Sequence, residues 1–104
     1  MIVFELTMPN VGSWNGHWSG ENDKHIIVKD ERYLRPKQKE NLPKILEQGN
    51  FWYRWDDGWT ACISVSKMFA KDANKLKKQS RGFYGYDWMV ESILKNGEII
   101  AEGK

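Results

Sequence analysis

An aromatic hairpin pattern at residues 51–65 sets the narrowest limits on the fold. The segment reads Phe-Trp-Tyr-Arg-Trp-Asp-Asp-Gly-Trp-Thr-Ala-Cys-Ile-Ser-Val. Large apolar residues recur at every second position on both sides of an Asp-Asp-Gly sequence, which is the period of a strand with one buried face. Two such runs joined by a short loop that contains glycine predict an antiparallel hairpin.

The register of this hairpin depends on the length of its loop. A two-residue loop at 57 and 58 would distribute the large apolar groups over both faces of the sheet. A three-residue loop at 56–58, with Gly58 in the left-handed conformation, keeps these groups on one face, and we expect this register. Its cross-strand pairs are Trp55–Trp59, Tyr53–Ala61 and Phe51–Ile63. Trp52 and Arg54 then point to the opposite face, beside Cys62. Trp52 is a candidate contact residue if helices cover only the other face, and a core residue if they cover both.

The rest of the chain predicts an α+β fold. Further strands are expected at 2–6, 24–29 and 98–101, and helices at 42–48, 70–79 and 87–96. This order indicates a mostly antiparallel sheet of about five strands with two or three helices packed on one face. A length of 104 residues is that of a single domain, which we expect to cover 1–104.

Boundary residues support two of the predicted helices. Asn41 is the expected cap of the helix at 42–48, with Pro43 in its first turn and Gly49 just past its end. Asn96-Gly97 is expected to end the helix at 87–96. The inward side of that helix is formed by Met89, Val90, Ile93 and Leu94.

Cysteine content and hydropathy indicate the cellular compartment in which we expect the protein. Cys62 is the one cysteine, so the chain cannot build a disulfide framework or a thiolate zinc cluster. The first eight residues lack a basic start, and no apolar run approaches the ~20 residues that span a membrane. We therefore expect a cytoplasmic protein that does not enter a membrane.

A glycine- and tryptophan-rich segment at 9–22 is the first candidate contact surface. Trp14 and Trp18 flank Asn15-Gly16, which is a strong turn signal. The two indoles either insert into a partner or fold back over an open edge of the core, and the sequence leaves both interpretations open. Together with the outer face of the hairpin, this gives the predicted partner-binding residues, which are Trp14, His17, Trp18, Trp52 and Arg54.

A basic stripe on the predicted helix at 70–79 is the second candidate surface. Phe69, Ala73 and Leu76 fall on one side of that helix. The predicted phosphate- or nucleic-acid-binding residues are Lys71, Lys75 and Lys78 on another side, followed by Arg81 and Tyr84. Tyr86 lies just beyond them and could stack on a base in the same way. The alternative is an ordinary solvated face, because lysine is the usual exterior residue.

Catalytic residues do not form a recognisable pattern. His17 lies in the glycine-rich segment and His25 opens a strand, and no spacing connects either to Cys62 or to a carboxylate. Asp56 and Asp57 are explained by turn chemistry. We therefore expect a protein that is not an enzyme and that needs neither a metal nor another cofactor.

Three segments resemble a group of small uncharacterised proteins of bacteriophages and mobile elements. They are Met8-Pro9-Asn10-Val11-Gly12-Ser13-Trp14-Asn15-Gly16-His17-Trp18-Ser19-Gly20-Glu21, Asp57-Gly58-Trp59 and Gly82-Phe83-Tyr84-Gly85-Tyr86-Asp87-Trp88-Met89. In that group a basic residue usually stands where His17 is, which counts against a phosphate-binding role for the first segment. The group supplies no functional residue.

What the resemblance implies is an accessory protein in a bacterial host. Such proteins often act by occupying a host component, so we expect a host protein or nucleoprotein as partner, and inhibition of a defence system in the style of anti-CRISPR proteins. The alternative is a domain that binds nucleic acid or a nucleotide signal. A tryptophan-rich face would suit a homodimer equally well.

Overall fold

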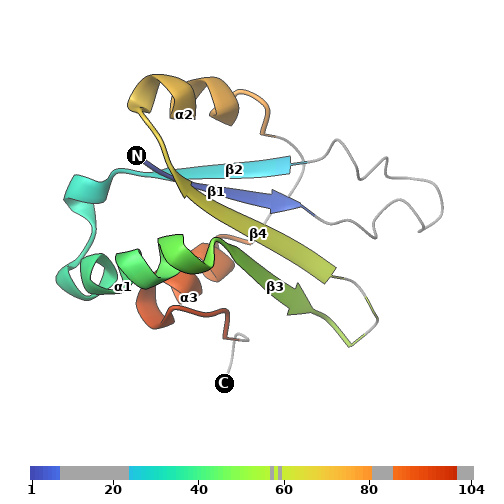
Figure 1. Cartoon of the computed structure of the whole chain (residues 1–104). Coiled ribbons are helices and arrows are strands. Elements are labelled where there is room, and N and C mark those ends of the chain that lie inside the picture. The colour runs from blue at the N-terminus through green and yellow to red at the C-terminus, as the bar shows by residue number, and fades with distance from the viewer. Residues whose placement is uncertain (8–23, 57, 59, 81–85, 101–104) are drawn as a thin grey trace.

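A four-stranded antiparallel sheet forms the centre of the molecule (Figure 1). The computed structural model describes residues 1–7, 24–56, 58, 60–80 and 86–100. The strands are β1 (Ile2–Thr7), β2 (Lys24–Lys29), β3 (Asn50–Arg54) and β4 (Thr60–Lys67). Their order is β2-β1-β4-β3, so β1 and β4 are central and β2 and β3 form the edges.

In the described part of the chain, three α-helices cover the sheet from both sides. They are α1 (Pro36–Gln48), α2 (Ala70–Lys77) and α3 (Asp87–Asn96), and a short 3₁₀ helix, η2 (Glu31–Tyr33), precedes α1. Figure 1 shows α1 and α3 below the sheet and α2 above it. The predicted α+β class is therefore confirmed, and the prediction that the helices share one face is wrong.

The hairpin has the register expected from its apolar pattern. Phe51 lies opposite Ile63, and Tyr53 lies opposite Ala61. Gly58 has a φ of 94°, a conformation that glycine adopts without strain. Trp59 lies outside the described residues, so the expected Trp55–Trp59 pair is not described. The three-residue loop thus assigns opposite faces to the odd and even residues of β3.

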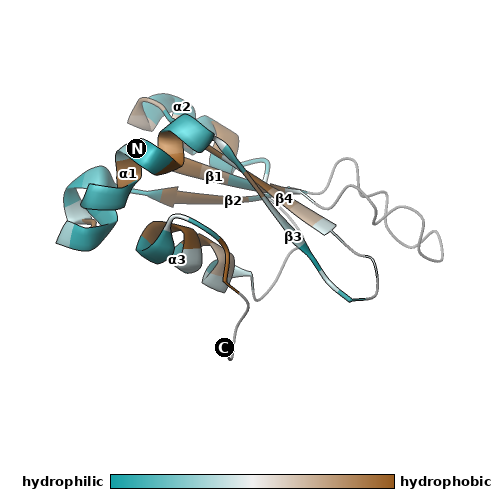
Figure 2. Cartoon of the chain, turned by 60° about the horizontal axis from the view of Figure 1, so that its bottom comes forward, coloured by the Kyte–Doolittle hydropathy of each residue, from teal (hydrophilic) through white to brown (hydrophobic). Residues whose placement is uncertain are grey.

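The face under α1 and α3 carries the main hydrophobic core. Figure 2 shows hydrophobic residues along β1 and on α3, while α1 is largely hydrophilic. Phe4 and Ile63 from the sheet are fully buried with Ile45 of α1. The four inward residues predicted for α3 are all buried, and Gly97 ends this helix in the left-handed conformation. On the same side Tyr53 makes edge-to-face ring contacts with Trp55 and Trp88.

The opposite face carries a smaller core under α2. Ala73 of α2 is buried against Val3 and Ile26, with Leu76 packed at the margin. Phe69 was predicted to share this inward side but is 82% exposed. The reason is that Phe69 precedes the helix and has an extended backbone, with φ −65° and ψ 151°, so helical periodicity does not position its side chain.

Helix α1 begins six positions earlier than its predicted start at residue 42. Pro36 occupies the first turn, and the Gln38 side chain accepts a hydrogen bond from the Arg35 amide at 2.9 Å. Pro43 therefore lies inside the helix. Asn41 does not cap α1. Its amide donates to the carbonyls of Leu94 and Lys95 at 3.0 and 2.9 Å, which lie at the end of α3.

We predict that Asn41→Ala will lower the free energy of unfolding by about 1–2 kcal/mol, because two carbonyls of α3 lose their donor. Urea denaturation checks this value. Asn74→Ala is the matched control, since Asn74 is an exposed helical asparagine, and it should leave stability within about 0.5 kcal/mol of wild type. Equal losses for the two variants would contradict the bridging role of Asn41.

The predicted strand at 98–101 is not formed by its described residues, 98–100. Ser92 of α3 binds this segment instead. The Ser92 hydroxyl donates to the Glu98 carbonyl at 3.1 Å and accepts from the Ile100 amide at 2.7 Å. Ile99 packs against the main core. The alternation that suggested a strand therefore reflects a short segment held against α3.

Candidate functional site

The predicted site residues fall into two groups. Trp14, His17, Trp18, Arg81 and Tyr84 lie outside the described residues. Those that are described all lie at the surface. They are Trp52, Arg54, Lys71, Lys75 and Lys78. Tyr86 contacts Trp55 edge to face and packs on the main core, so it is a packing residue in this structure.

Trp52 points to the face that its register predicted and is exposed there, with 63% of its surface open. It lies on the α2 face of the sheet, opposite Cys62. Helix α2 packs over β1 and β2, so the half formed by β3 and β4 is uncovered by any described helix. We call this half the Trp52 face. Its side chains come from Asn50, Trp52, Arg54, Cys62, Ser64 and Ser66.

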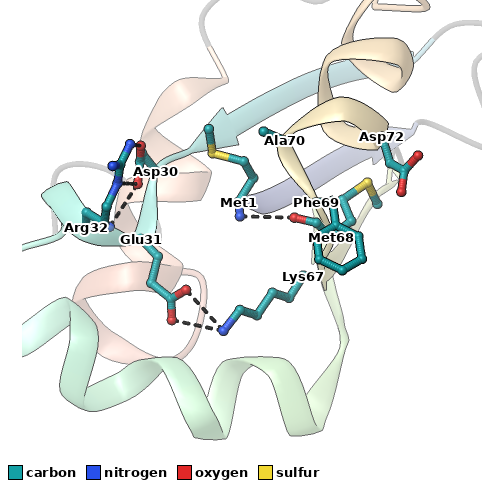
Figure 3. Close-up of a pocket in the computed structure, with 9 residues that line it drawn as sticks. All are labelled: Met1, Asp30, Glu31, Arg32, Lys67, Met68, Phe69, Ala70 and Asp72. Atoms are coloured by element: carbon teal, nitrogen blue, oxygen red, sulfur yellow. Dashed lines mark hydrogen bonds and ion pairs between the residues drawn. The ribbon is translucent and has the colours of Figure 1, made fainter.

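A pocket of about 640 Å³ lies at the end of the sheet where β1 begins (Figure 3). We call it the Phe69 pocket. It is lined by Met1, Asp30, Glu31, Arg32, Lys67, Met68, Phe69, Ala70 and Asp72. Figure 3 shows residues 30–32 on one side, Met68 and Phe69 on the other, and Met1 between them.

The fold itself brings these three segments together. β1, β2 and β4 are neighbours in the sheet, so the start of β1 lies beside the ends of the other two. The Met1 nitrogen donates to the Met68 carbonyl at 3.0 Å, which continues the contact between β1 and β4. Because Phe69 precedes α2, its ring stays at the rim of the pocket. The apolar part of the lining is therefore two thioethers, the methyl group of Ala70 and one exposed ring.

Paired charges form the rest of the rim. The Arg32 guanidinium donates to both oxygens of Asp30, at 3.1 and 2.7 Å. These hydrogen bonds lower the pKa of Asp30 to about 2, so its carboxylate stays ionised down to strongly acidic pH. Lys67 and Glu31 form a second ion pair at 3.1 Å. The Asp72 carboxylate forms neither a hydrogen bond nor an ion pair with any described residue, so this negative charge is available to a ligand.

The lysine stripe is solvent-exposed along α2. Lys71, Lys75, Lys77 and Lys78 are all exposed, and none of them forms an ion pair with a described residue. Lys71, Lys75 and Lys78 lie on the outer side of the helix, whose inner side carries Ala73, while Lys77 follows Ala73 by four positions at the helix end. The basic character that the sequence predicted is therefore accessible to a ligand.

His25 makes contacts that the sequence did not suggest. Its Nδ1 lies 3.3 Å from the Ser80 hydroxyl, and its Nε2 lies 3.7 Å from a carboxylate oxygen of Asp87. The Ser80 hydroxyl also accepts a hydrogen bond from the Ile26 amide at 3.0 Å. The side chain of Asp87 is 81% exposed. These contacts join β2 to the segments that end α2 and begin α3. In a catalytic triad His25 would be the base, Ser80 the nucleophile and Asp87 the group that orients the imidazole. Here the Ser80 hydroxyl already accepts a hydrogen bond from a backbone amide, and the Asp87 oxygen lies beyond hydrogen-bond distance of Nε2.

Cys62 lies on the Trp52 face. Burial raises the pKa of its thiol, and a hydrogen bond with Ser64 opposes that rise only in part. A raised pKa reduces the thiolate fraction at neutral pH, and thiolate is the reactive form.

Among the described residues, no three His, Cys, Asp or Glu side chains are grouped to hold a metal ion. Nor is any helix of that part long and apolar enough to cross a bilayer.

Comparison with known proteins leaves the site to be judged on its own geometry, since no family model, curated protein or solved structure matches the chain.

The sequence suggested Trp52 and the lysines as candidate contact residues but gave no indication of the Phe69 pocket. The position of Phe69 alone held one signal. Phe69 precedes a short helix, and residues at a helix start have extended backbones, so its side chain need not follow the inward side.

Proposed function

We propose that this domain binds another protein at the Phe69 pocket and does not catalyse a reaction. The observation that carries this proposal is Phe69 itself, a large ring with 82% of its surface exposed beside two methionines. Burying such a ring stabilises a complex by about 1.5–3 kcal/mol. An apolar centre surrounded by charged groups is the usual composition of a binding hot spot.

The charges of the rim indicate the partner's chemistry. The Met1 ammonium donates to the Met68 carbonyl, and four of the five charged side chains of the lining neutralise one another in two ion pairs. Asp72 is the remaining one, so a cation placed beside it would gain the most. We therefore propose that the partner inserts an apolar side chain beside Phe69 and places a lysine or arginine near Asp72. Methionine side chains adapt to such an insertion because they are long and unbranched.

The class of partner follows from the resemblance to phage and mobile-element proteins. We propose a bacterial host protein, and a component of host defence as the first class to test. This proposal rests on the resemblance in the segments 8–21, 57–59 and 82–89, while the contact surface rests on the pocket.

Affinity capture from a bacterial lysate treated with nuclease tests the proposal. We predict that Phe69→Ser will reduce partner retention by about 10- to 100-fold, which corresponds to the loss of about 1.5–3 kcal/mol. Ile100→Ser is the matched control, because Ile100 is another exposed apolar residue that lies near α3, away from the pocket. Asp72→Asn should reduce retention less than Phe69→Ser does. Equal retention by wild type and Phe69→Ser would contradict a role for the pocket.

A second candidate function is nucleic-acid or nucleotide binding by α2. It is favoured by the exposure of Lys71, Lys75 and Lys78 without acidic partners among the described residues. In that case the recovered ligand would disappear on nuclease treatment or at high salt. A Lys71→Glu/Lys75→Glu/Lys78→Glu variant would lose it, while Phe69→Ser would retain it.

A further inference from the structure

The open edge of β3 is a second interaction surface, separate from the Phe69 pocket. β3 pairs with β4 on one side only, and no described strand lies on its other side. An unpaired strand edge presents free backbone donors and acceptors to another chain. Charges and Pro residues usually protect such an edge, and β2 at the opposite edge carries Lys24 and Lys29 in ion pairs with Glu5 and Glu91. β3 has an exposed tryptophan at its centre, and its one charged residue, Arg54, lies at its end.

The hydrogen-bond pattern shows which residues of β3 face this edge. The Val65 amide donates to the Gly49 carbonyl at 2.7 Å, so residue 49 belongs to a hydrogen-bonded pair of the β3–β4 ladder. Hydrogen-bonded and non-bonded pairs alternate along an antiparallel ladder. Residues 51 and 53 therefore bond to β4, and the backbone groups of Asn50, Trp52 and Arg54 point outward. The Gln48 side chain already donates to the Asn50 carbonyl at 3.3 Å.

We propose that β3 pairs antiparallel with β3 of a second copy of this chain, with Trp52 at the two-fold axis. β3 has five residues, so Trp52 is its middle residue and lies opposite Trp52 of the other copy in the centred register. Outward-facing residues then meet outward-facing residues along the whole strand, which allows roughly six backbone hydrogen bonds once the Gln48 side chain of each copy releases the Asn50 carbonyl.

The side chains of β3 favour a second copy as the occupant. In this register the two indoles form a cross-strand aromatic pair. Asn50 of each copy lies opposite Arg54 of the other, so a guanidinium meets a neutral amide and like charges are kept apart. Arg54 is exposed and forms no hydrogen bond or ion pair with a described residue, so it is free for this contact. A net charge of +2 adds little repulsion between the copies.

The pairing would leave both cores and both pockets unchanged. Phe51 and Tyr53 stay on the face covered by α1 and α3, because their side chains point away from the Trp52 face. The two sheets would become one continuous sheet with a two-fold axis perpendicular to it. Both α2 helices, and therefore both Phe69 pockets, would lie on the same side. The dimer would thus present two pockets on one side, and a partner with two copies of the matching site would bind with higher apparent affinity without a new kind of contact.

Cysteine crosslinking tests the register directly. In a Cys62→Ser background, Trp52→Cys should form a covalent dimer with a short thiol crosslinker, because residue 52 lies opposite itself. Asn50→Cys alone should not crosslink, and neither should Arg54→Cys, whereas a mixture of these two variants should. Crosslinking of all three single variants to the same extent, or of none, would overturn the proposed register.

Sedimentation of the unmodified chain provides an independent test. We predict a concentration-dependent doubling of mass, and a Trp52→Glu variant that remains monomeric with wild-type stability. A wild-type chain that stays monomeric at high concentration would overturn the dimer. If Trp52→Glu then also failed to capture a protein that the wild type captures, the β3 edge would bind a different chain, and the dimer would still be overturned. Neither result bears on Phe69→Ser, so failure of the dimer and failure of the pocket are distinguishable.

Discussion

Replacing Phe51 with alanine is expected to lower the free energy of unfolding by about 3–5 kcal/mol, because it removes a ring from a packed core. Phe51 is 3% exposed and lies opposite Ile63 on the face covered by α1 and α3. Urea denaturation followed by circular dichroism measures this change as a shift in midpoint at constant slope.

Phe69→Ala is the matched control for Phe51→Ala. The same atoms are deleted from a side chain that is 82% exposed, so the expected change is within about 0.5 kcal/mol. The comparison separates the two uses of aromatic residues in this chain. A loss above about 2 kcal/mol for Phe69→Ala would mean that this ring stabilises the fold. The exposure of Phe69 would then no longer support a binding role for the pocket.

The second large effect is expected at the contact between α2 and the sheet. Ala73→Asp should lower the free energy of unfolding by about 3 kcal/mol or more, because it places a carboxylate against Val3 and Ile26. Ala73 is completely buried in this smaller core.

Asn74→Asp introduces the same charged group one position later, on the exposed side of α2. We expect it to change stability by no more than about 0.5 kcal/mol. Thermal or urea denaturation of both variants checks the pair. If Ala73→Asp were as stable as Asn74→Asp, α2 would not pack on the second face of the sheet.

Sequence periodicity was sufficient where one strong pattern determined the structure. The hairpin register followed from keeping Phe51, Tyr53 and their partners on one face, since a slip by one residue would have exposed them all. The inward side of α3 followed from its helical spacing, and Gly97 marked its end. The hairpin register placed Trp52 on the face away from Phe51, but whether that face was covered could not be read from the sequence; the structure leaves Trp52 63% exposed.

Other parts depended on contacts that a linear pattern does not contain. Asn41 looked like a helix cap, but its amide binds carbonyls of α3 more than fifty positions away in the chain. The alternation at 98–101 looked like a strand, but Ser92 supplies the hydrogen bonds that a neighbouring strand would have supplied. Local propensity is a weak guide wherever such tertiary hydrogen bonds are available.

The candidate site was only partly predictable for the same reason. The Phe69 pocket combines residues 1, 30–32 and 67–72, which become neighbours only when β1, β2 and β4 are placed side by side. The contact of His25 with Ser80 and Asp87 also joins distant segments. Lysines on α2, by contrast, could be placed on an outer side from spacing alone.

Titration calorimetry measures how much Phe69 contributes to the affinity for a protein partner. The purified partner recovered by the wild-type chain would be titrated into wild type and Phe69→Ser at low and at high salt. Binding through the pocket predicts a dissociation constant that rises about 10- to 100-fold in Phe69→Ser, by a similar factor at both salt concentrations. An unchanged constant in Phe69→Ser, together with a steep loss of affinity at high salt, would contradict it.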